Sequence, residues 1–550
     1  MLNNPKILIL DEPTAGLDPT ERVRFRNLIS ELSEDRIVIL STHIVSDVED
    51  IANEIWLMKD GKIMQQGNLD QTLASMQEKV YACEVSQADA TKMMKKFKVS
   101  NMKAESGMVN LRIIASEPPI AGASVVEPTL EDVFLYYFGE KGGMIRYEIK
   151  KIFSKSISKV SLVVLLFSLL ISCYFAITNV SFLDEQGKSH TGIEAARSLR
   201  EEKQKWEGIL DETALQDVMD EYKKISEEYP IRPGDDSTNL LHDSKVQGFS
   251  EIKDMINMGF CEFRDFNYYR IDSLSKEEVG HIYENRGKSL EKWLNSEDAN
   301  GLFDEDEKAF LIEQYSEMKA PLYYEDYDGW KSVLSYAQTI IMLIMLVSAF
   351  LVSGIFSHEF SWKSDSIFFS TKLGRNKGTR SKIIAGFIVV SAIYFIVISL
   401  YSLVVLGCLG FGGGEVMIQT GFWHWKSFYN ITYMQLYLLT VVAGYIGTVF
   451  CLFLSMLVSA KTHTAVVAVT IPFAILFLPL FVSNFDFLSG ILGVFPDRLL
   501  QINEIINTFD LYHIGGKIVG SIPIMLVIYP ILCVLMVPLM YHVYHKTEIK

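Results

Sequence analysis

Long apolar segments alternate with polar ones along the second two-thirds of the chain. Six runs are long and apolar enough to cross a bilayer as helices, which needs about 20 residues. They are Val160–Val180, Val333–Phe356, Ile383–Phe411, Leu436–Val458, Ala465–Val482 and Ile522–Tyr544. This pattern predicts an all-α membrane domain with six spans. Prolines inside the later runs predict kinks there, and no buried charge pair is expected within the spans.

The first forty-odd residues have a different pattern. Ile7 to Leu10 is a continuous apolar run, which is typical of a strand buried on both faces of a parallel sheet. A helix is expected from Asp18-Pro19, and a second apolar run spans 37–40. Together these form one βαβ unit. It places Asp11, Glu12 and His43 at the same edge of one sheet, where open α/β sheets bind ligands.

Three short motifs here resemble those of ABC transporter ATPases. ILILDEP, AGLD and STH are similar to the Walker B strand, the D-loop and the switch histidine of that family. The resemblance implies that Asp11 holds Mg²⁺, that Glu12 polarises the attacking water, and that His43 contacts the γ-phosphate of ATP. It implies that Asp18, the D-loop residue, lies at the dimer interface and takes part in cofactor binding. Phosphoryl transfer needs such a cation and a group that orients water. The alternative is that these residues only cap their strands.

Two motifs of that family are missing from the sequence. No GxxxxGK[ST] loop, which would cradle the phosphates, occurs anywhere in the chain, and no LSGGQ-like signature precedes residue 7. The sequence is therefore expected to carry the C-terminal part of an ATPase domain, either through a shortened reading frame or as half of a split ATPase completed by a separate N-terminal fragment. Without its neighbours, the first strand would expose an apolar edge.

The ATPase-like part is predicted to have two sections. Residues 1–68 form the partial core, which closes with a hairpin over 55–67 whose turn contains Asp-Gly. Residues 69–143 form a small α/β appendage with strands at 80–85 and 109–114, and its end, 127–140, resembles the last helix of exporter ATPases. Gly142-Gly143 is a flexible break, and Met144 reads like the start of a second protein.

The membrane part resembles the ABC-2 permease family. Residues 144–180 hold a basic amphipathic helix (145–159), expected on the inner membrane surface, and the first span. Spans two to six occupy 330–550. Lysines and arginines concentrate in 357–382, which predicts a cytoplasmic loop. The resemblance implies that this loop docks on the ATPase and gives Glu359 a coupling role. Alternatively, the loop is only a topology signal.

Residues 181–329 form a long polar insert, predicted to be extracellular. It holds 36 Asp and Glu against 18 Lys and Arg, so it accounts for the whole net charge of −16. Ten Trp, Tyr and Phe residues could supply a core, so a folded helical domain is expected, and its single cysteine, Cys261, excludes an internal disulfide. Either the insert captures or gates a cationic or peptide-like substrate, or it is a solubilising cap.

Composition agrees with a protein that is partly in a membrane. The 550 residues are 49% apolar, and the six cysteines form no CxxC pair. No basic patch with interleaved aromatics indicates nucleic-acid binding. The main interpretation is an ABC-2 exporter subunit of a bacterial cytoplasmic membrane, which uses ATP and Mg²⁺, contacts membrane lipid and pairs with a second ABC subunit as a homodimer or heterodimer. The alternative is a non-hydrolysing docking or sensor protein that carries an ATPase remnant.

Overall fold

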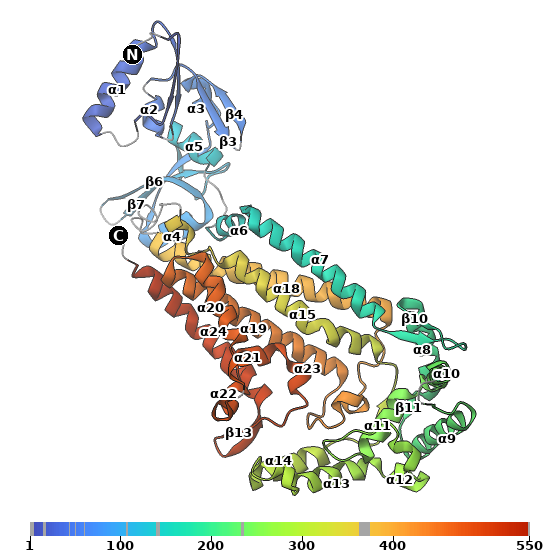
Figure 1. The fold of residues 1–550 in the computed structure, drawn as a ribbon. Helices are drawn as coiled ribbons and strands as arrows, with labels where there is room; N and C mark the ends of the chain where they lie inside the picture. Colours follow the sequence, from blue (N-terminus) through green and yellow to red (C-terminus); the bar gives the residue numbers. More distant parts are fainter. Residues whose placement is uncertain are drawn as a thin grey trace. The chain divides into compact units, whose positions relative to one another are not determined.

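The computed structural model describes residues 5–14, 18–42, 44–49, 51–59, 61–105, 108–138, 144–232, 236–361, 374–483 and 485–547. The chain divides into two compact units, Met1–Gly143 and Met144–Lys550, and each is described here by itself. Figure 1 shows the elements of both.

The first unit begins with the expected βαβ arrangement. β1 (Ile7–Asp11) pairs in parallel with β2 (Ile37–Ser41), and α1 (Pro19–Leu32) connects them. The expectation of a strand buried on both faces is wrong. Ile7 and Ile9 are 55% and 72% exposed, because β1 and β2 form a sheet of two strands in the described part of the chain. The apolar run therefore forms the predicted strand, but its side chains on one face remain exposed.

A hairpin and a second, larger sheet complete this unit. β3 (Ile55–Lys59) and β4 (Lys62–Gly67) confirm the predicted hairpin, and Gly61 takes the positive φ of its turn. The larger sheet has the order β6-β7-β5-β8. Its strands are β5 (Val80–Ser86), β6 (Lys98–Glu105), β7 (Met108–Ile114) and β8 (Ser124–Val125). The helices of this unit after α1 are α2 (Val45–Glu49), α3 (Leu69–Ala74), α4 (Gln87–Lys96) and α5 (Leu130–Phe138). Val80, Ile114 and Val133 are buried between β5, β7 and α5.

In the described part of the second unit, five helices are long and apolar enough to cross a membrane. They include α7 (Ser156–Thr178), α15 (Asp328–Val352), α18 (Thr379–Leu409), α19 (Tyr433–Thr462) and α24 (Ser521–His545). The sixth expected span is instead a 13-residue helix, α20 (Ala465–Phe477), followed by the short α21 (Pro479–Val482). Pro479 cannot donate to the preceding turn, which explains the break there. α15 packs against α7, α18 and α19, and α19 packs against α24 (Figure 1).

The insert is largely helical, and it shares one compact unit with the long helices. Its helices are α8 (Ile193–Lys203), α9 (Glu212–Glu228), α10 (Asp236–Val246), α11 (Ser250–Phe260), α12 (Lys276–Gly280), α13 (Ile282–Leu294) and α14 (Glu305–Ser316). Tyr222, Phe263 and Trp293 are buried in it, but Tyr268 and Tyr269 are mostly exposed. All six cysteines of the chain are free, including Cys261 of the insert.

Short elements join these parts. The strand pairs are β9 (Ser181–Leu183) with β10 (Ser189–Thr191), β11 (Gly208–Ile209) with β12 (Tyr323–Tyr324), and β13 (Leu511–Ile514) with β14 (Lys517–Gly520). The other α-helices among the described residues are α6 (Met144–Ser154), α16 (His358–Ser361), α22 (Ser489–Leu492) and α23 (Ile502–Ile505). The β11–β12 pair brings residues 208–209 of the insert beside residues 323–324 near its end.

Candidate functional sites

Asp11 lies at the carboxyl end of β1, directly opposite Ser41 at the end of β2. The Ser41 hydroxyl donates a hydrogen bond to Asp11 Oδ1. This contact follows from the parallel register, which brings the carboxyl ends of both strands to one edge. The other oxygen of Asp11 and the Ser41 hydroxyl are oxygen ligands of the kind that Mg²⁺ prefers.

Glu12 follows at the point where β1 turns away from the sheet. Its φ is 45°, and its backbone N–H donates to Ser41 O at 2.9 Å. Left-handed backbone is uncommon for a residue with a side chain and is frequent at functional sites. The Thr42 hydroxyl lies 3.5 Å from Glu12 Oε2. The turn thus places a second carboxylate at the same edge as Asp11.

The other two predicted residues of this site differ in their placement. Asp18 caps α1, because its Oδ1 accepts hydrogen bonds from the backbone N–H groups of Thr20 at 2.9 Å and Glu21 at 2.8 Å. His43 lies outside the described residues. The structure therefore brings Asp11 and Glu12 together and places Asp18 at a helix start.

The residues at this edge fit the metal-binding part of an ATPase site but not its phosphate-binding part. Asp11 and Ser41 suit a hard cation, and Glu12 lies beside them. Phosphate groups, however, are normally held by a loop of backbone N–H groups, and the sequence contains no GxxxxGK[ST]. These residues alone could hold Mg²⁺ but not the phosphates of ATP.

Glu359, the predicted coupling residue, is the centre of a buried ionic network. Its Oε1 lies 2.6 Å from Lys151 Nζ on α6 and 2.6 Å from Lys382 Nζ on α18. The Tyr544 hydroxyl on α24 donates to Oε2 at 3.3 Å. Lys382 also lies 3.4 Å from Glu148. One carboxylate therefore joins α6, α18 and α24, and we name this set the Glu359 network.

The charges of the Glu359 network affect one another. Burial disfavours ionised Glu359, but the ammonium groups of Lys382 and Lys151 outweigh it and hold the pKa of Glu359 below its usual value. Nearby, burial followed by repulsion from Lys151 and Lys382 lowers the pKa of Lys155 to about 8.

The Glu359 network draws on residues of both basic segments that flank the expected spans. Lys151, on the basic amphipathic helix, contacts Glu359, because a buried carboxylate needs a charged or hydrogen-bonding partner. Lys382, directly before the third expected span, has a fully buried side chain.

A second buried network was missed by the sequence reasoning. Lys203 Nζ on α8 lies 2.9 Å from Glu251 Oε2 on α11 and 2.7 Å from Asp328 Oδ2 at the start of α15. Lys331 Nζ lies 3.2 Å from Glu251 Oε1. Although burial opposes ionisation of Glu251, Lys203 and Lys331 lower its pKa. We name this set the Lys203 network. The only sequence signal was charged residues directly before an apolar span.

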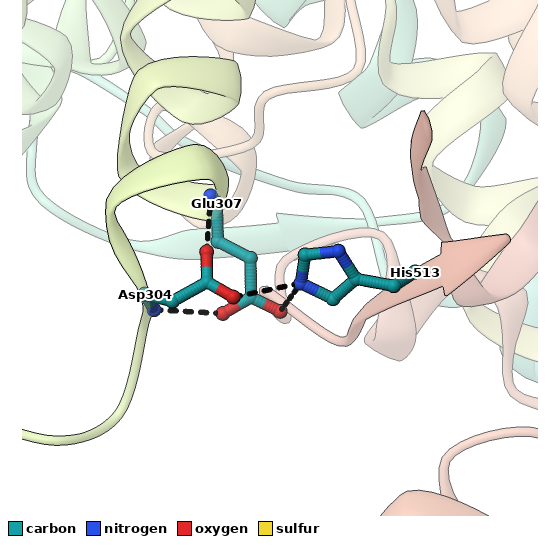
Figure 2. A group of neighbouring side chains, drawn as sticks. All are labelled: Asp304, Glu307 and His513. Atoms are coloured by element: carbon teal, nitrogen blue, oxygen red, sulfur yellow. Dashed lines mark hydrogen bonds and ion pairs between the residues drawn. The ribbon is translucent and has the colours of Figure 1, made fainter. Parts of the chain in front are cut away.

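A third cluster lies on the surface of the insert. His513 Nε2, on β13, is 2.7 Å from Asp304 Oδ2 and 3.8 Å from Glu307 Oε1 (Figure 2). Asp304 and Glu307 also form the capping box that starts α14. These residue types can bind a metal ion, but each carboxylate already caps the helix. As it stands, the cluster is an ion pair that fastens the β13–β14 hairpin to α14.

Comparison with known proteins identifies relatives of the N-terminal region. The chain is 36% identical over 87 residues to the uncharacterized ABC transporter ATP-binding protein YxlF of Bacillus subtilis, which covers 16% of this chain and 30% of that protein. It is 30% identical over 144 residues to the methionine import ATP-binding protein MetN of Streptococcus pneumoniae, covering 25% and 39%. It is 40% identical over 65 residues to the energy-coupling factor transporter ATP-binding protein EcfA2 of Lacticaseibacillus paracasei, covering 12% and 23%.

The chain thus spans about a third of the length of the first two of these curated relatives. No known family profile matches the chain. Among the described residues, the second unit adds five helices long and apolar enough to cross a membrane. The N-terminal region of this chain is therefore homologous to ABC transporter ATP-binding proteins, and it is fused to a helical part consistent with a membrane domain.

Proposed function

We propose that this chain is a subunit of an ABC-2 type exporter that couples ATP binding and hydrolysis to transport across a bacterial cytoplasmic membrane. The observation that supports the proposal is the placement of Asp11, bonded to Ser41, and the adjacent Glu12 at the carboxyl edge of a parallel strand pair, in the N-terminal region, which is homologous to ABC ATP-binding proteins. Apolar helices in the same chain supply the membrane part.

Each residue of the edge has a proposed role. Asp11 holds Mg²⁺, which would neutralise charge on the phosphates when ATP is bound. Glu12 orients and deprotonates the attacking water, and His43 contacts the terminal phosphate. Asp18 lies at the dimer interface, where the second ABC subunit, identical or homologous, contributes to the site.

The phosphate-binding loop has to come from elsewhere in the assembly. Ile7, Ile9, Ile37 and Ile39 are exposed along β1 and β2, which is the face that further strands or helices of an ATPase core would cover. A separate polypeptide with GxxxxGK[ST], or residues preceding this sequence, would complete the site.

Export, the ABC-2 type and the orientation of the membrane part rest on the sequence pattern. The ATP-binding relatives include a methionine import protein, so the ATPase part does not set the direction. The basic loop at 357–382 favours a cytoplasmic location for Glu359 and an extracellular one for residues 181–329. The Glu359 network joins the loop's first residues to three helices, which supports a coupling role.

The test uses the full chain together with the polypeptide that carries GxxxxGK[ST]. We expect ATP hydrolysis by the assembly and not by the chain alone. Glu12→Gln should abolish hydrolysis while ATP binding persists, because the amide cannot accept a proton. Hydrolysis that is unchanged by Glu12→Gln would overturn the proposal.

A second function is favoured by the missing GxxxxGK[ST]. In it, the ATPase-like part binds no nucleotide and serves as a docking platform in a membrane sensor complex. If the assembly binds neither ATP nor its analogues but retains its partners on purification, this function replaces the first.

A further inference from the structure

A large cleft lies where the insert meets the long helices of the second unit. Its volume is about 1000 Å³, at the upper end of the range for small-molecule sites. Its walls come from the end of α7, from α10 and α11 of the insert, from the start of α15, and from the segments 421–424 and 503–507. Nothing in the ATPase-like unit contributes to it.

One wall of the cleft is aromatic. Tyr268, Phe422 and Trp423 line it, and the ring of Phe266 contacts Tyr268 and Phe422. The ring centroids of Phe266 lie 4.4 Å from Tyr268 and 4.5 Å from Phe422, and Phe422 lies 4.8 Å from Trp423. Trp423 and Tyr268 are nevertheless 74% and 61% exposed. Large rings held in place but left open to solvent offer faces on which a ligand can stack.

The cleft also has a surplus of negative charge. Five carboxylates line it, against the ammonium groups of three lysines. The carboxylates are Asp243, Glu251, Asp254, Asp328 and Glu504, and the lysines are Lys203, Lys253 and Lys331. Glu251 and Asp328 form ion pairs with lysines within the Lys203 network. The surplus of negative charge therefore comes from the other carboxylates of the cleft.

The remaining carboxylates are only partly compensated. Asp254 has Lys253 at 3.4 Å, yet burial, which outweighs this lysine, raises the pKa of Asp254. Glu504 has no cation within ion-pair distance among the described residues. The buried Oδ1 of Asn503, in the same wall, accepts no hydrogen bond within the described chain. Acceptors without donors in a cleft favour a ligand that brings positive charge and N–H donors.

We propose that this cleft binds an organic cation with an aromatic or apolar body. The rings of Trp423 and Tyr268 stack on the body and attract the positive charge, while Asp254 and Glu504 supply the opposite charge. The inference does not rest on the proposed ATP-driven function, because no residue of the ATPase-like unit takes part.

Two probes of the same shape and opposite charge test the charge selectivity. The full chain in maltoside micelles, without nucleotide, is dialysed against tetraphenylphosphonium or tetraphenylborate, and uptake by protein-free micelles is subtracted. We expect saturable binding of the phosphonium at one site per chain and none of the borate. Equal binding of both ions, or no saturable binding of the cation, would overturn the proposal.

Variants locate the site. Asp254→Asn, Glu504→Gln and Trp423→Ala should each weaken phosphonium binding about fivefold, as expected for one partly exposed charge or ring. Matched controls are Asp217→Asn, an exposed acid on α9 away from the cleft, and Trp56→Ala, an exposed ring of the first unit. Both should bind like the wild type. Glu504 is exposed, so its variant is expected to fold even if the Asp254 variant does not, and unchanged binding by Glu504→Gln and Trp423→Ala would contradict this placement.

Discussion

Lys382 Nζ and Glu359 Oε1 lie 2.6 Å apart, and both side chains are buried. Lys382 lies in the first turn of α18, and Glu359 follows the end of α15. The pair therefore connects the ends of these two long helices. Lys151 brings α6 to the same carboxylate. A rearrangement of the loop that holds Glu359 would therefore be felt by every helix in the network.

Replacing Glu359 by Gln should destabilise the second unit strongly. Two lysines would remain near a neutral amide in a buried site, and breaking a buried pair typically costs about 3–5 kcal/mol. Thermal unfolding in micelles measures this. Glu313→Gln, an exposed glutamate on α14, is the matched control and should unfold like the wild type.

The double variant Glu359→Gln/Lys382→Met separates the effect of Glu359 on stability from its proposed role in coupling. Because it removes both partners, it should recover part of the lost stability. If Glu359 also couples ATP hydrolysis to transport, the double variant should hydrolyse ATP without transporting. Full transport by this variant would leave Glu359 with a structural role alone.

The Lys203 network predicts an acid-sensitive insert. The pKa of Glu251 lies near 4.5 in the unfolded chain and is lowered to about 2 in the fold, by Lys203 and Lys331 against the opposing effect of burial. A lowered carboxyl pKa adds stability that is complete above the unfolded pKa and is lost as pH falls from about 4.5 towards 2. Unfolding temperatures measured between pH 7 and pH 3 should therefore drop less steeply for Glu251→Gln than for the wild type. Parallel pH curves would contradict this.

Asp18 has two separable roles, one observed and one proposed. As the cap of α1 it accepts two backbone N–H hydrogen bonds, so Asp18→Ala should cost about 1 kcal/mol of stability. Asn caps equally well, so Asp18→Asn should unfold like the wild type. If Asp18→Asn still lowers ATP hydrolysis in the complete assembly, its charge acts at the dimer interface. Normal hydrolysis by Asp18→Asn would limit Asp18 to capping.

The orientation of the insert can be measured by cysteine labelling. In a chain without its native cysteines, Asn295→Cys, exposed in the insert, should react with a membrane-impermeant maleimide on intact cells. Asn110→Cys, exposed on β7, should react only after the cells are opened. The reverse pattern would place the insert in the cytoplasm.

Local sequence predicted much of the fold. The Asp-Gly turn, the β1–α1–β2 order and the five long helices follow from short-range rules: turn chemistry, capping and unbroken apolar length. The sixth span is not confirmed, because apolar length alone does not show where a helix ends. Pro479 interrupts 465–482, and the helix stops at Phe477.

Burial and ionic pairing did not follow from local rules. Ile7 and Ile9 read as core residues, yet they are exposed, because burial depends on what packs over a strand and not on the strand itself. Lys203, Glu251 and Asp328 looked like ordinary polar residues of an acidic insert. They become one buried network only in the folded chain, where α8, α11 and the start of α15 meet.

The sequence by itself therefore determined the elements and the chemistry of the Asp11–Glu12 edge, because strands, helices and motifs are encoded in neighbouring residues. The tertiary structure alone decided which charges are paired, which rings stay open to solvent and where a cleft forms. These properties depend on contacts between residues tens to hundreds of positions apart, such as Lys151 with Glu359 and Phe266 with Phe422. No local pattern specifies such contacts, since each partner is chosen by the packing of whole helices.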